Sequence, residues 1–276
     1  MIEPAEPGKR TGTKRAGFLF GLLLTTLFSA AALFFVWKIA DHLIDERRSL
    51  DYWDELQDSV VITSPETQDT RPVTDAQEQT GDADGAAEPE IPAAIDFDSL
   101  HAISGNAVAW IFAPGTNINY VIAQSNDNAY YLRRLLDGTA ASGGTLFADY
   151  RCSADLADWN TVIYGHQMKN GTMFGSLTNY RDPGYYAEHP VMYLYVPGKR
   201  YRLELIAGYT TDIYDAAYSV PASKEQRDAL LARAAGKSSF LSGVTVGEED
   251  RLVTLSTCSY DYNNARYVVI GRLVED

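Results

Sequence analysis

The chain has 276 residues, which is enough for one or two domains, and its 37 acidic and 23 basic side chains give a formal net charge of −14. This balance argues against nucleic acid as a partner, because binding phosphates requires a basic face and the sequence offers none. Half of the net charge comes from residues 64–92, which hold eight acidic side chains and a single basic one, Arg71. The acidity therefore belongs largely to one segment rather than to a whole domain.

Residues 16–37 form an uncharged stretch of 22 residues, AGFLFGLLLTTLFSAAALFFVW. At about 1.5 Å per residue, a helix of this length spans the roughly 30 Å hydrocarbon core of a membrane. Basic residues precede the stretch and acidic residues follow it, so the positive-inside rule predicts a cytoplasmic tail (1–15) and a transmembrane signal anchor (16–40). The predicted location is the cell membrane, crossed once, with the rest of the chain outside. A cleaved signal peptide is the alternative, but the apolar run continues past the small residues at 29–32 and exceeds a typical signal core.

Three further segments follow the anchor. Residues 41–62 are charged, with apolar residues at intervals, and predict a juxtamembrane helix. Residues 63–94 contain no aromatic side chain and are rich in polar residues, Pro, Gly and Ala, so they cannot bury enough apolar surface to offset the entropy of ordering. We expect an acidic flexible linker that holds the folded domain, residues 95–276, away from the membrane.

The folded domain is expected to begin with a short helix that Asp96 caps and Gly105 ends. A second helix is expected to start at Asn126 or Asp127 and to end at Gly138. Eight strands are expected at 107–113, 119–124, 145–150, 161–166, 191–197, 200–211, 252–258 and 266–274. Short strands with few helices predict a small, mostly antiparallel β-barrel.

Residues 212–249 interrupt the strand pattern. Within them, Ser223 and Gln226 have the spacing of a capping box, an apolar stripe follows, and Gly236 suits the end of a helix. We therefore expect a helical insertion before the last two strands. The sequence contains no P-loop, dinucleotide fingerprint or zinc-ligand spacing, so no cofactor or metal is predicted.

The chain has only two cysteines, Cys152 and Cys258. In an exported domain they invite a disulfide, which would close a loop of about a hundred residues with a large entropic gain. Cys258 also ends an apolar strand, where a cysteine is either a small core residue or a nucleophile. The residues alone do not decide between a disulfide, a core residue and a nucleophile. A disulfide would exclude Cys258 as a nucleophile.

The neighbours of Cys258 favour the nucleophile. If strands 252–258 and 266–274 form a hairpin, Cys258 and Arg266 face each other across its mouth. A guanidinium beside a thiol favours the thiolate and can hold an oxyanion. Among four histidines, His166 ends its strand and opens a polar loop, where a catalytic imidazole would be useful. A lone histidine is more often structural, so the spacing by itself makes only part of the case.

Two motifs strengthen this interpretation by resemblance. TLSTC followed by Arg266, and YGHQMKNGTMF around His166, resemble the signatures of sortases, the membrane-anchored cysteine transpeptidases of Gram-positive bacteria. The stretches WIFAPGTNINYVIAQSNDNAYYL and GTLFADYR are similar to class B of this family. The resemblance covers about residues 95–274, and the N-terminal anchor is also as the family has it.

The resemblance implies a mostly β fold: a closed eight-stranded sortase-type barrel with short helices, in which Cys258, His166 and Arg266 converge in a groove. Cys258 would attack a carbonyl in the C-terminal sorting signal of an exported protein and form a thioacyl-enzyme. His166 would protonate the leaving amine and then activate an amine of a peptidoglycan precursor, while Arg266 would stabilise the oxyanion. The helix around 223–236 would wall the groove. The implied partners are the signal peptide, the precursor amine and, through the N-terminal helix, the membrane.

Two residues near the cysteine have open roles. Thr257 precedes Cys258 and fits the family pattern as a substrate-binding residue, with packing within the strand as an equal alternative. Asp261 lies between Cys258 and Arg266, where it either pairs with Arg266 or is an ordinary surface residue.

Other functions are compatible with the same residues. The nucleophile would also serve a pilin-polymerising sortase, or a hydrolytic cysteine peptidase that releases its product to water. A non-catalytic, membrane-tethered β-domain would require Cys258 to be buried or disulfide-bonded. An L,D-transpeptidase is disfavoured because its His and Cys usually share one motif, whereas 92 positions separate His166 from Cys258 here.

Overall fold

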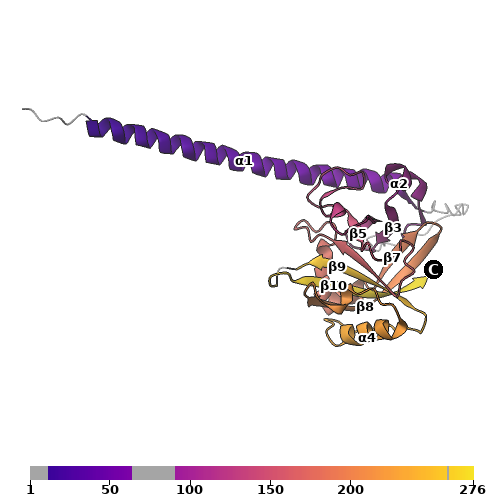
Figure 1. Ribbon diagram of the computed structural model, residues 1–276. Helices are drawn as coiled ribbons and strands as arrows, with labels where there is room; N and C mark the ends of the chain where they lie inside the picture. Colours follow the sequence, from indigo (N-terminus) through magenta and orange to yellow (C-terminus); the bar gives the residue numbers. More distant parts are fainter. Residues whose placement is uncertain (1–11, 64–90, 260) are drawn as a thin grey trace, which may run out of the picture. The chain divides into compact units, whose positions relative to one another are not determined.

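The computed structural model describes residues 12–63, 91–259 and 261–276, with side chains from Leu22 onward (Figure 1). The chain forms two compact units, one ending at Arg48 and one running from Ser49 to Asp276. Most of the expected acidic linker, residues 64–90, lies outside the described residues. All the described strands belong to the second unit.

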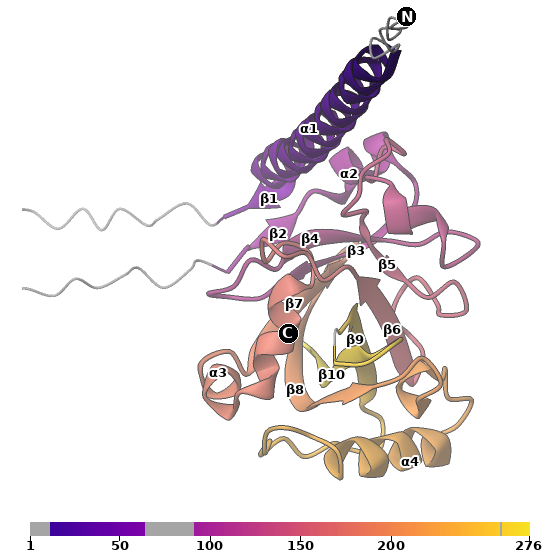
Figure 2. The same cartoon turned by 90° about the vertical axis from the view of Figure 1, so that its left-hand side faces the viewer.

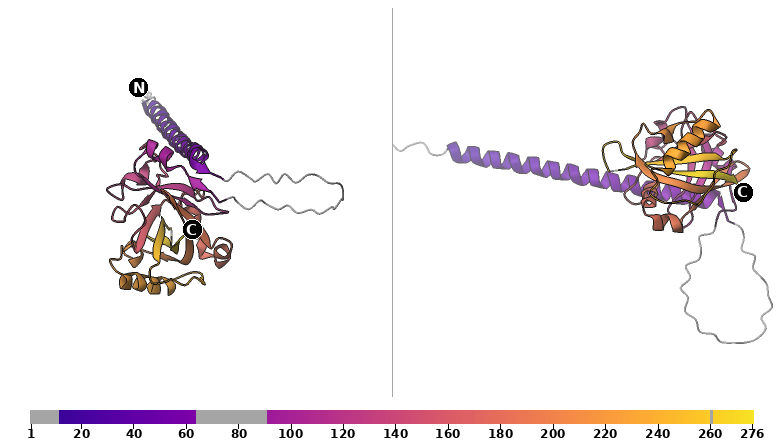
Figure 3. Two further views of the ribbon diagram at one scale, coloured as in Figure 1. Left: turned by 90° about the vertical axis from the view of Figure 1, so that its right-hand side faces the viewer. Right: turned by 90° about the horizontal axis from the view of Figure 1, so that it is seen from below.

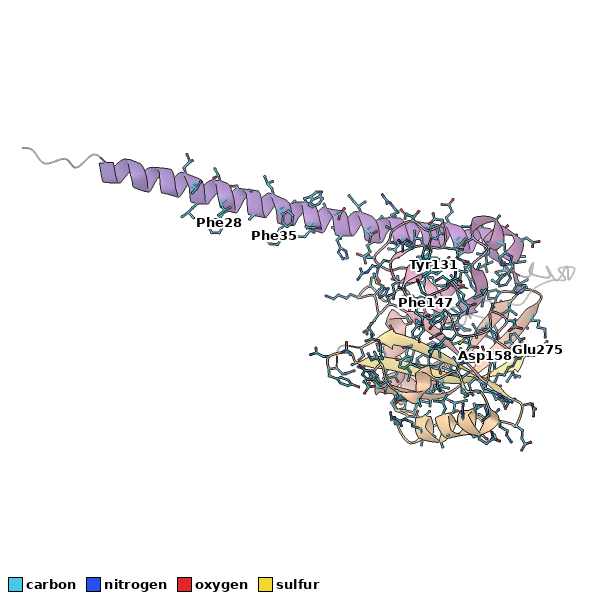
Figure 4. The ribbon with its side chains drawn as sticks, viewed as in Figure 1. Phe28, Phe35, Tyr131, Phe147, Asp158 and Glu275 are labelled. Atoms are coloured by element: carbon cyan, nitrogen blue, oxygen red, sulfur yellow. The ribbon has the colours of Figure 1, made fainter. Side chains whose placement is uncertain are left out.

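One continuous α-helix, α1 (Gly12–Val60), contains the apolar stretch of the N-terminal unit. The large apolar side chains described between Leu22 and Ile44 are exposed, among them Phe28 and Phe35 at 71% and 64% (Figure 4). By length and composition this helix is suited to cross a membrane, and such a surface is more stable in lipid than in water. The helix is therefore consistent with a membrane anchor, although a signal sequence meets the same criteria.

The last turns of α1 belong to the second unit and pack against its strands. Trp53 is 2% exposed and sets its ring edge-on against Tyr120, with the ring centroids 5.5 Å apart. The Gln57 amide donates to the Asn119 carbonyl at 2.8 Å and accepts from the Asn119 side chain at 3.1 Å. The folded unit therefore includes the end of α1, and the juxtamembrane helix expected at residues 41–62 is the continuation of this same helix.

A two-stranded sheet joins the two flanks of the acidic segment. β1 (Val61–Ile62) pairs antiparallel with β2 (Ala94–Ile95), and the Ala93 amide donates to the Ile62 carbonyl at 2.8 Å. The flanking residues thus lie side by side within one unit. The expectation that this segment holds the domain away from the membrane does not hold, because its length cannot change the distance between two paired ends.

Eight strands form a closed barrel in the order β10-β8-β7-β3-β4-β5-β6-β9, which confirms the expected fold class (Figure 2). They are β3 (Ala107–Phe112), β4 (Asn119–Ala123), β5 (Leu146–Ala148), β6 (Asn160–Gly165), β7 (Val191–Val196), β8 (Lys199–Thr211), β9 (Arg251–Cys258) and β10 (Arg266–Glu275). Each coincides with a predicted strand to within a few residues. Most neighbours are antiparallel, as expected, but β4 and β5 are parallel, and so are β6 and β9.

The helices of the second unit are short. Besides α1 they are α2 (Phe97–Ile103), α3 (Pro183–Glu188), α4 (Lys224–Ala235) and the 3₁₀ helices η1 (Tyr130–Arg133), η2 (Gly175–Arg181) and η3 (Ala216–Tyr218). Asp96 caps α2 by accepting from the Ser99 amide, and Ser223 caps α4 by accepting from the Gln226 amide, as the sequence predicted.

The second predicted helix, expected to end at Gly138, forms only as the single turn η1. Its N-cap is Ala129 rather than Asn126 or Asp127, and the Asp127 carboxylate accepts from the Ala129 and Tyr130 amides at 2.8 Å each in the turn before it. The chain is already extended at Arg134, which forms a β-bridge with Ala140. This pairing satisfies the polar groups of the backbone after η1, so the helix expected to continue to Gly138 does not form.

Apolar side chains form two cores in this unit. The larger one joins the barrel strands to α2 and the end of α1. In the smaller one, Leu230 and Ala234 of α4 gather with Ala207 of β8 and with Val268 and Ile270 of β10. Figure 3 shows α4 lying across these strands. The insertion helix therefore covers the outer face of the barrel.

The packing of α1 predicts a large effect of Trp53→Ala. Because the ring is buried against Tyr120, its removal should lower the free energy of unfolding by about 3–5 kcal/mol. Urea unfolding of the full-length protein in detergent, followed by circular dichroism, measures this change. Trp37→Ala is the matched control, since Trp37 lies on the same helix but is 57% exposed. Equal unfolding midpoints for the two variants would contradict the proposed packing role.

Candidate active site

A cavity of about 410 Å³ lies at one end of the barrel strands. Cys258, His166 and Arg266 all line it, together with Thr257. The structure therefore brings together the three residues that the sequence singled out, although they come from distant parts of the chain. Phe147, labelled in Figure 4, is among the apolar side chains that line the same cavity.

Strand pairing explains why these residues meet. β9 ends at Cys258 and β10 begins at Arg266, and the two residues are register partners in an antiparallel pair, as the predicted hairpin required. β6 runs parallel to β9 with Gly165 opposite Thr257. The residues that follow Gly165 and Thr257 in the chain are His166 and Cys258, so both lie at the same end of the barrel. The strands β6, β9 and β10 are neighbours in the barrel (Figure 2). This arrangement brings the three residues to one place.

Neither cysteine is in a disulfide. Cys258 is free and partly exposed, whereas Cys152 is free and buried. The Cys152 thiol lies 3.9 Å from the Asn160 carbonyl, and burial raises its pKa to about 11. A buried thiol of this kind is inert. The disulfide alternative is therefore wrong in this structure, and Cys258 is the accessible sulfur.

The imidazole of His166 is oriented by a backbone carbonyl. Its Nε2 lies 2.7 Å from the carbonyl oxygen of Leu132, within the single turn η1. A carbonyl oxygen only accepts hydrogen bonds, so Nε2 carries a proton in this arrangement. Nδ1 is then the ring nitrogen that remains to give or take a proton. No sequence motif pointed to Leu132, because a backbone contact leaves no signature in the side chain.

Gly144 makes room for this carbonyl. Its φ is +58°, and a Cβ built there would overlap the Tyr131 carbonyl oxygen and would lie 2.7 Å from that of Leu132. Only glycine combines this backbone conformation with so close an approach. The absent side chain at Gly144 is thus part of what positions His166.

Arg266 and Thr257 border the cavity in different ways. The Arg266 guanidinium donates through Nη1 to the Ala265 carbonyl at 3.0 Å, and no other described residue accepts from its planar fork. Thr257 is 1% exposed, and its hydroxyl has no hydrogen-bond partner among the described residues. A substrate-binding role for Thr257 stays a prediction.

Asp261 does not pair with Arg266. It forms an ion pair with Arg181 of η2, and Arg181 also donates to the Ser259 hydroxyl at 2.7 Å. The hydrogen bond from Ser259 and the charge of Arg181 lower the pKa of the Asp261 carboxyl. The expected pairing with Arg266 is therefore wrong, whereas Asp261 is a surface residue as the alternative had it, and its ion pair ties the loop after Cys258 to η2.

A buried carboxylate lies behind another part of the cavity wall. Asp149 has a fully buried side chain, and Asn128, Arg151 and Tyr164, which all donate to it, line the cavity as Asp149 itself does. Burial alone would raise the pKa of this carboxyl, but the hydrogen bonds from Arg151, Tyr164 and Asn128 lower it to about 2. The sequence analysis missed Asp149. This residue lies in the stretch GTLFADYR, which supported the family resemblance but suggested no role for the carboxylate.

The insertion contributes to the cavity through η3 rather than through its helix. Tyr218 stacks on Tyr164 with the ring centroids 6.0 Å apart and the planes 8° apart. Its hydroxyl lies 2.9 Å from that of Ser256, and burial raises its pKa to about 12. Ile213 and Tyr218 line the cavity, whereas residues 223–236 do not. The expectation that the insertion helix walls the groove is therefore wrong.

Within the described residues, no group of three or more His, Cys, Asp or Glu side chains could hold a metal ion. The chemistry available at the cavity is that of a thiol, an imidazole and a guanidinium. This set suits acyl transfer through a covalent thioester.

Comparison with known proteins identifies the family. A family model of the sortase domain matches residues 111–274. The sortase B of Listeria monocytogenes is 32% identical over 259 residues, which cover 92% of this chain and 96% of that protein. The chain belongs to the sortase family. The sortase B of Staphylococcus aureus is 30% identical over 182 residues, which cover 65% of this chain and 75% of that protein.

Solved sortase structures agree in fold. A crystal structure of sortase B from B. anthracis superposes with a TM-score of 0.66 at 31% identity, covering 85% of this chain and all of the other. A Staphylococcus aureus sortase B–substrate complex gives a TM-score of 0.61 at 29% identity, covering 65% of this chain and 84% of the other. This sortase is therefore of class B, a cysteine transpeptidase type that acts in cell-wall anchoring.

The close approach at Gly144 predicts that Gly144→Ala is more costly than an ordinary glycine substitution. Gly198, in the turn between β7 and β8, has φ +77° but nothing within 4 Å of a built Cβ, so Gly198→Ala is the matched control. The control should lose about 1–2 kcal/mol of unfolding free energy through backbone strain alone. Gly144→Ala should lose roughly 1–3 kcal/mol more, because backbone carbonyls must move. Urea unfolding measures both, and similar losses would contradict the close approach.

The environment of Asp149 predicts a pH dependence of stability. Its pKa is about 2 in the folded protein against the model-peptide value of 3.8. The stabilisation is therefore present above pH 4 and is lost as the pH falls through 2, on the order of 2 kcal/mol in total. Asp149→Asn should remove this part of the acid destabilisation. Urea unfolding between pH 2 and 5 tests it, and parallel pH curves for the two proteins would contradict it.

Proposed function

We propose that this sortase cleaves a C-terminal sorting signal of exported proteins through a thioacyl-enzyme on Cys258 and transfers the acyl group to an amine of a peptidoglycan precursor. The observation that carries the proposal is the delivery of Cys258, His166 and Arg266 by three adjacent strands to one cavity. Each group has a distinct chemical task there.

In the first half-reaction, the Cys258 thiolate attacks the carbonyl carbon of the scissile peptide bond. Negative charge develops on the carbonyl oxygen, and the Arg266 guanidinium stabilises it through the N–H groups that do not bind the Ala265 carbonyl. The C–N bond then breaks, and the departing amine takes a proton from His166. The product is a thioester between Cys258 and the N-terminal part of the substrate.

In the second half-reaction, the neutral imidazole accepts a proton from the incoming amine as that amine attacks the thioester carbonyl. The new amide bond forms, the C–S bond breaks, and Cys258 leaves as the thiolate. Since Nε2 of His166 donates to the Leu132 carbonyl, Nδ1 is the atom that carries the proton in both halves. Fixing one nitrogen in this way keeps the other aimed for transfer.

The substrate class is supported by the relatives. One similar structure is described as a Staphylococcus aureus sortase B–substrate complex, and another as sortase B complexed with triglycine. For this chain we infer a sorting-signal peptide as acyl donor, with Thr257 beside the nucleophile as a substrate-binding residue. The long apolar helix supports attachment to the cell membrane by one pass, with the N-terminus in the cytoplasm and the catalytic domain outside.

The proposal predicts that Cys258→Ala abolishes formation of the acyl-enzyme. The full-length protein in detergent is incubated with a library of sorting-signal peptides, and intact-protein mass spectrometry detects the added acyl mass. Wild type should gain the mass of the N-terminal peptide fragment, and Cys258→Ala should gain none. Cys152→Ala is the control, because this other cysteine is buried and should leave acylation intact.

Acylation of Cys258→Ala, or acylation that depends on Cys152, would overturn the assignment of the nucleophile. Adding a glycine oligomer or a diaminopimelate-containing peptide separates transfer from hydrolysis. A transpeptidase joins the acyl fragment to the added amine, whereas a hydrolytic peptidase releases only the free acid.

A further inference from the structure

We propose that Asp149 is a positioning residue for peptide recognition: one buried carboxylate orients three side chains of the cavity wall and sets the charge that this wall presents to the acyl donor. The inference rests on the proposed function and deepens it, because it concerns how the same cavity selects its peptide. Asp149 acts through the residues that it holds and takes no part in the chemistry at Cys258.

The carboxylate collects donors from three parts of the chain. The Tyr164 hydroxyl donates to it at 2.9 Å from β6, and the Asn128 amide donates at 3.0 Å from the loop before η1. Arg151 donates through Nε and Nη2 at 2.8 Å each, one bond to each carboxylate oxygen. All three donors line the cavity that contains Cys258. A shared acceptor therefore couples their orientations.

Each donor is further restrained, so that its direction at the wall is defined. The Asn128 side-chain oxygen accepts from the Tyr150 amide at 3.0 Å, which directs its NH₂ group to Asp149. Arg151 Nη2 also donates to the Tyr218 carbonyl at 3.0 Å, and Tyr218 stacks on Tyr164. Asp149 thus connects the β5–β6 loop to the η3 wall of the insertion.

The turn that carries Asp149 is itself held by the barrel. The Asp149 amide donates to the Val162 carbonyl of β6 at 2.8 Å. The Gln124 side chain, which follows β4, donates to the carbonyls of Asp149 and Cys152 at 2.9 and 2.8 Å. A carboxylate fixed to rigid strands is a suitable support for side chains that must contact a peptide.

The pairing also decides the electrostatics of the wall. The Arg151 side chain is 47% exposed where it borders the cavity, and the buried Asp149 compensates its charge. Without that compensation the guanidinium becomes a free cation at the wall and attracts acidic side chains. The wild-type wall therefore favours uncharged peptide side chains that accept hydrogen bonds, and loss of the carboxylate shifts the preference toward acidic ones.

The experiment compares full-length wild type and Asp149→Asn in detergent, with the library peptide that wild type acylates fastest. We expect KM to rise at least tenfold while kcat stays within about threefold. The rate of Cys258 alkylation by iodoacetamide should not change. In the whole library, the ratio of kcat/KM for peptides with an added Asp to those with Asn at the same place should rise several-fold. A role confined to stability would move neither the KM nor this ratio.

Asp158→Asn is the matched control. Asp158 lies in the same β5–β6 loop (Figure 4), and its carboxylate also accepts from a backbone amide, that of Ser153, but it does not line the cavity. This variant should keep the wild-type KM and peptide preference. If Asp149→Asn and Asp158→Asn changed KM and peptide preference equally, the proposal would be overturned, because the change would reflect a general disturbance of the β5–β6 loop.

Tyr164→Phe keeps the test valid if Asp149→Asn does not fold. It removes one hydrogen bond to Asp149 and retains the ring, so KM should rise by a smaller factor than in Asp149→Asn. Where Asp149→Asn folds, the variant with both substitutions should raise KM by less than the product of the two single increases, since the Tyr164 hydroxyl acts through the Asp149 carboxylate. A wild-type KM in either single variant overturns the positioning role. That result would leave the proposed function intact. If wild type itself were not acylated at Cys258, the proposed function and the positioning role would both be rejected.

Discussion

The parallel pairing of β6 with β9 is the constraint on which the site depends. It sets Gly165 beside Thr257, so the residues that follow, His166 and Cys258, leave neighbouring strands at the same end of the barrel. The antiparallel pairing of β9 with β10 adds Arg266 by register. Backbone hydrogen bonds, rather than contacts among the three side chains, therefore fix which residues meet. A shift of one residue in either register would turn one of these side chains to the other face of the sheet.

Two polar contacts refine what the strands deliver. The Leu132 carbonyl binds Nε2 of His166, in space that Gly144 leaves open. On the other wall, Asp149 gathers the polar ends of Asn128, Arg151 and Tyr164. The Asp149 side chain is fully buried, and a buried polar group without a partner is costly, so its single satisfied arrangement is strongly preferred. The cavity combines one wall set by main chain with another set by a shared carboxylate.

Sequence reasoning succeeded where local pattern carries the information. The barrel strands, the caps Asp96 and Ser223, and the hairpin that pairs Cys258 with Arg266 were all predictable from short stretches. It failed where a contact that the pattern does not show competes with the expected one. The helix after Asp127 stops early because Arg134 bridges to Ala140, and Asp261 turns to Arg181 on η2. The helix α4 lies over the outer face of β8 and β10, because its apolar stripe is buried there against the side chains of these strands.

By itself the sequence determined the chemical groups, the strands that carry them and the family they resemble, because residue type and short strand-forming runs are local properties of the chain. Tertiary structure alone decided that Cys152 and Cys258 stay apart, that Leu132 orients His166, and that Asp149 supports the cavity wall. It also decided that β1 and β2 pair across the acidic segment. These facts depend on contacts between residues far apart in the chain, and a backbone carbonyl or a buried acceptor looks the same in the sequence whichever partner it meets.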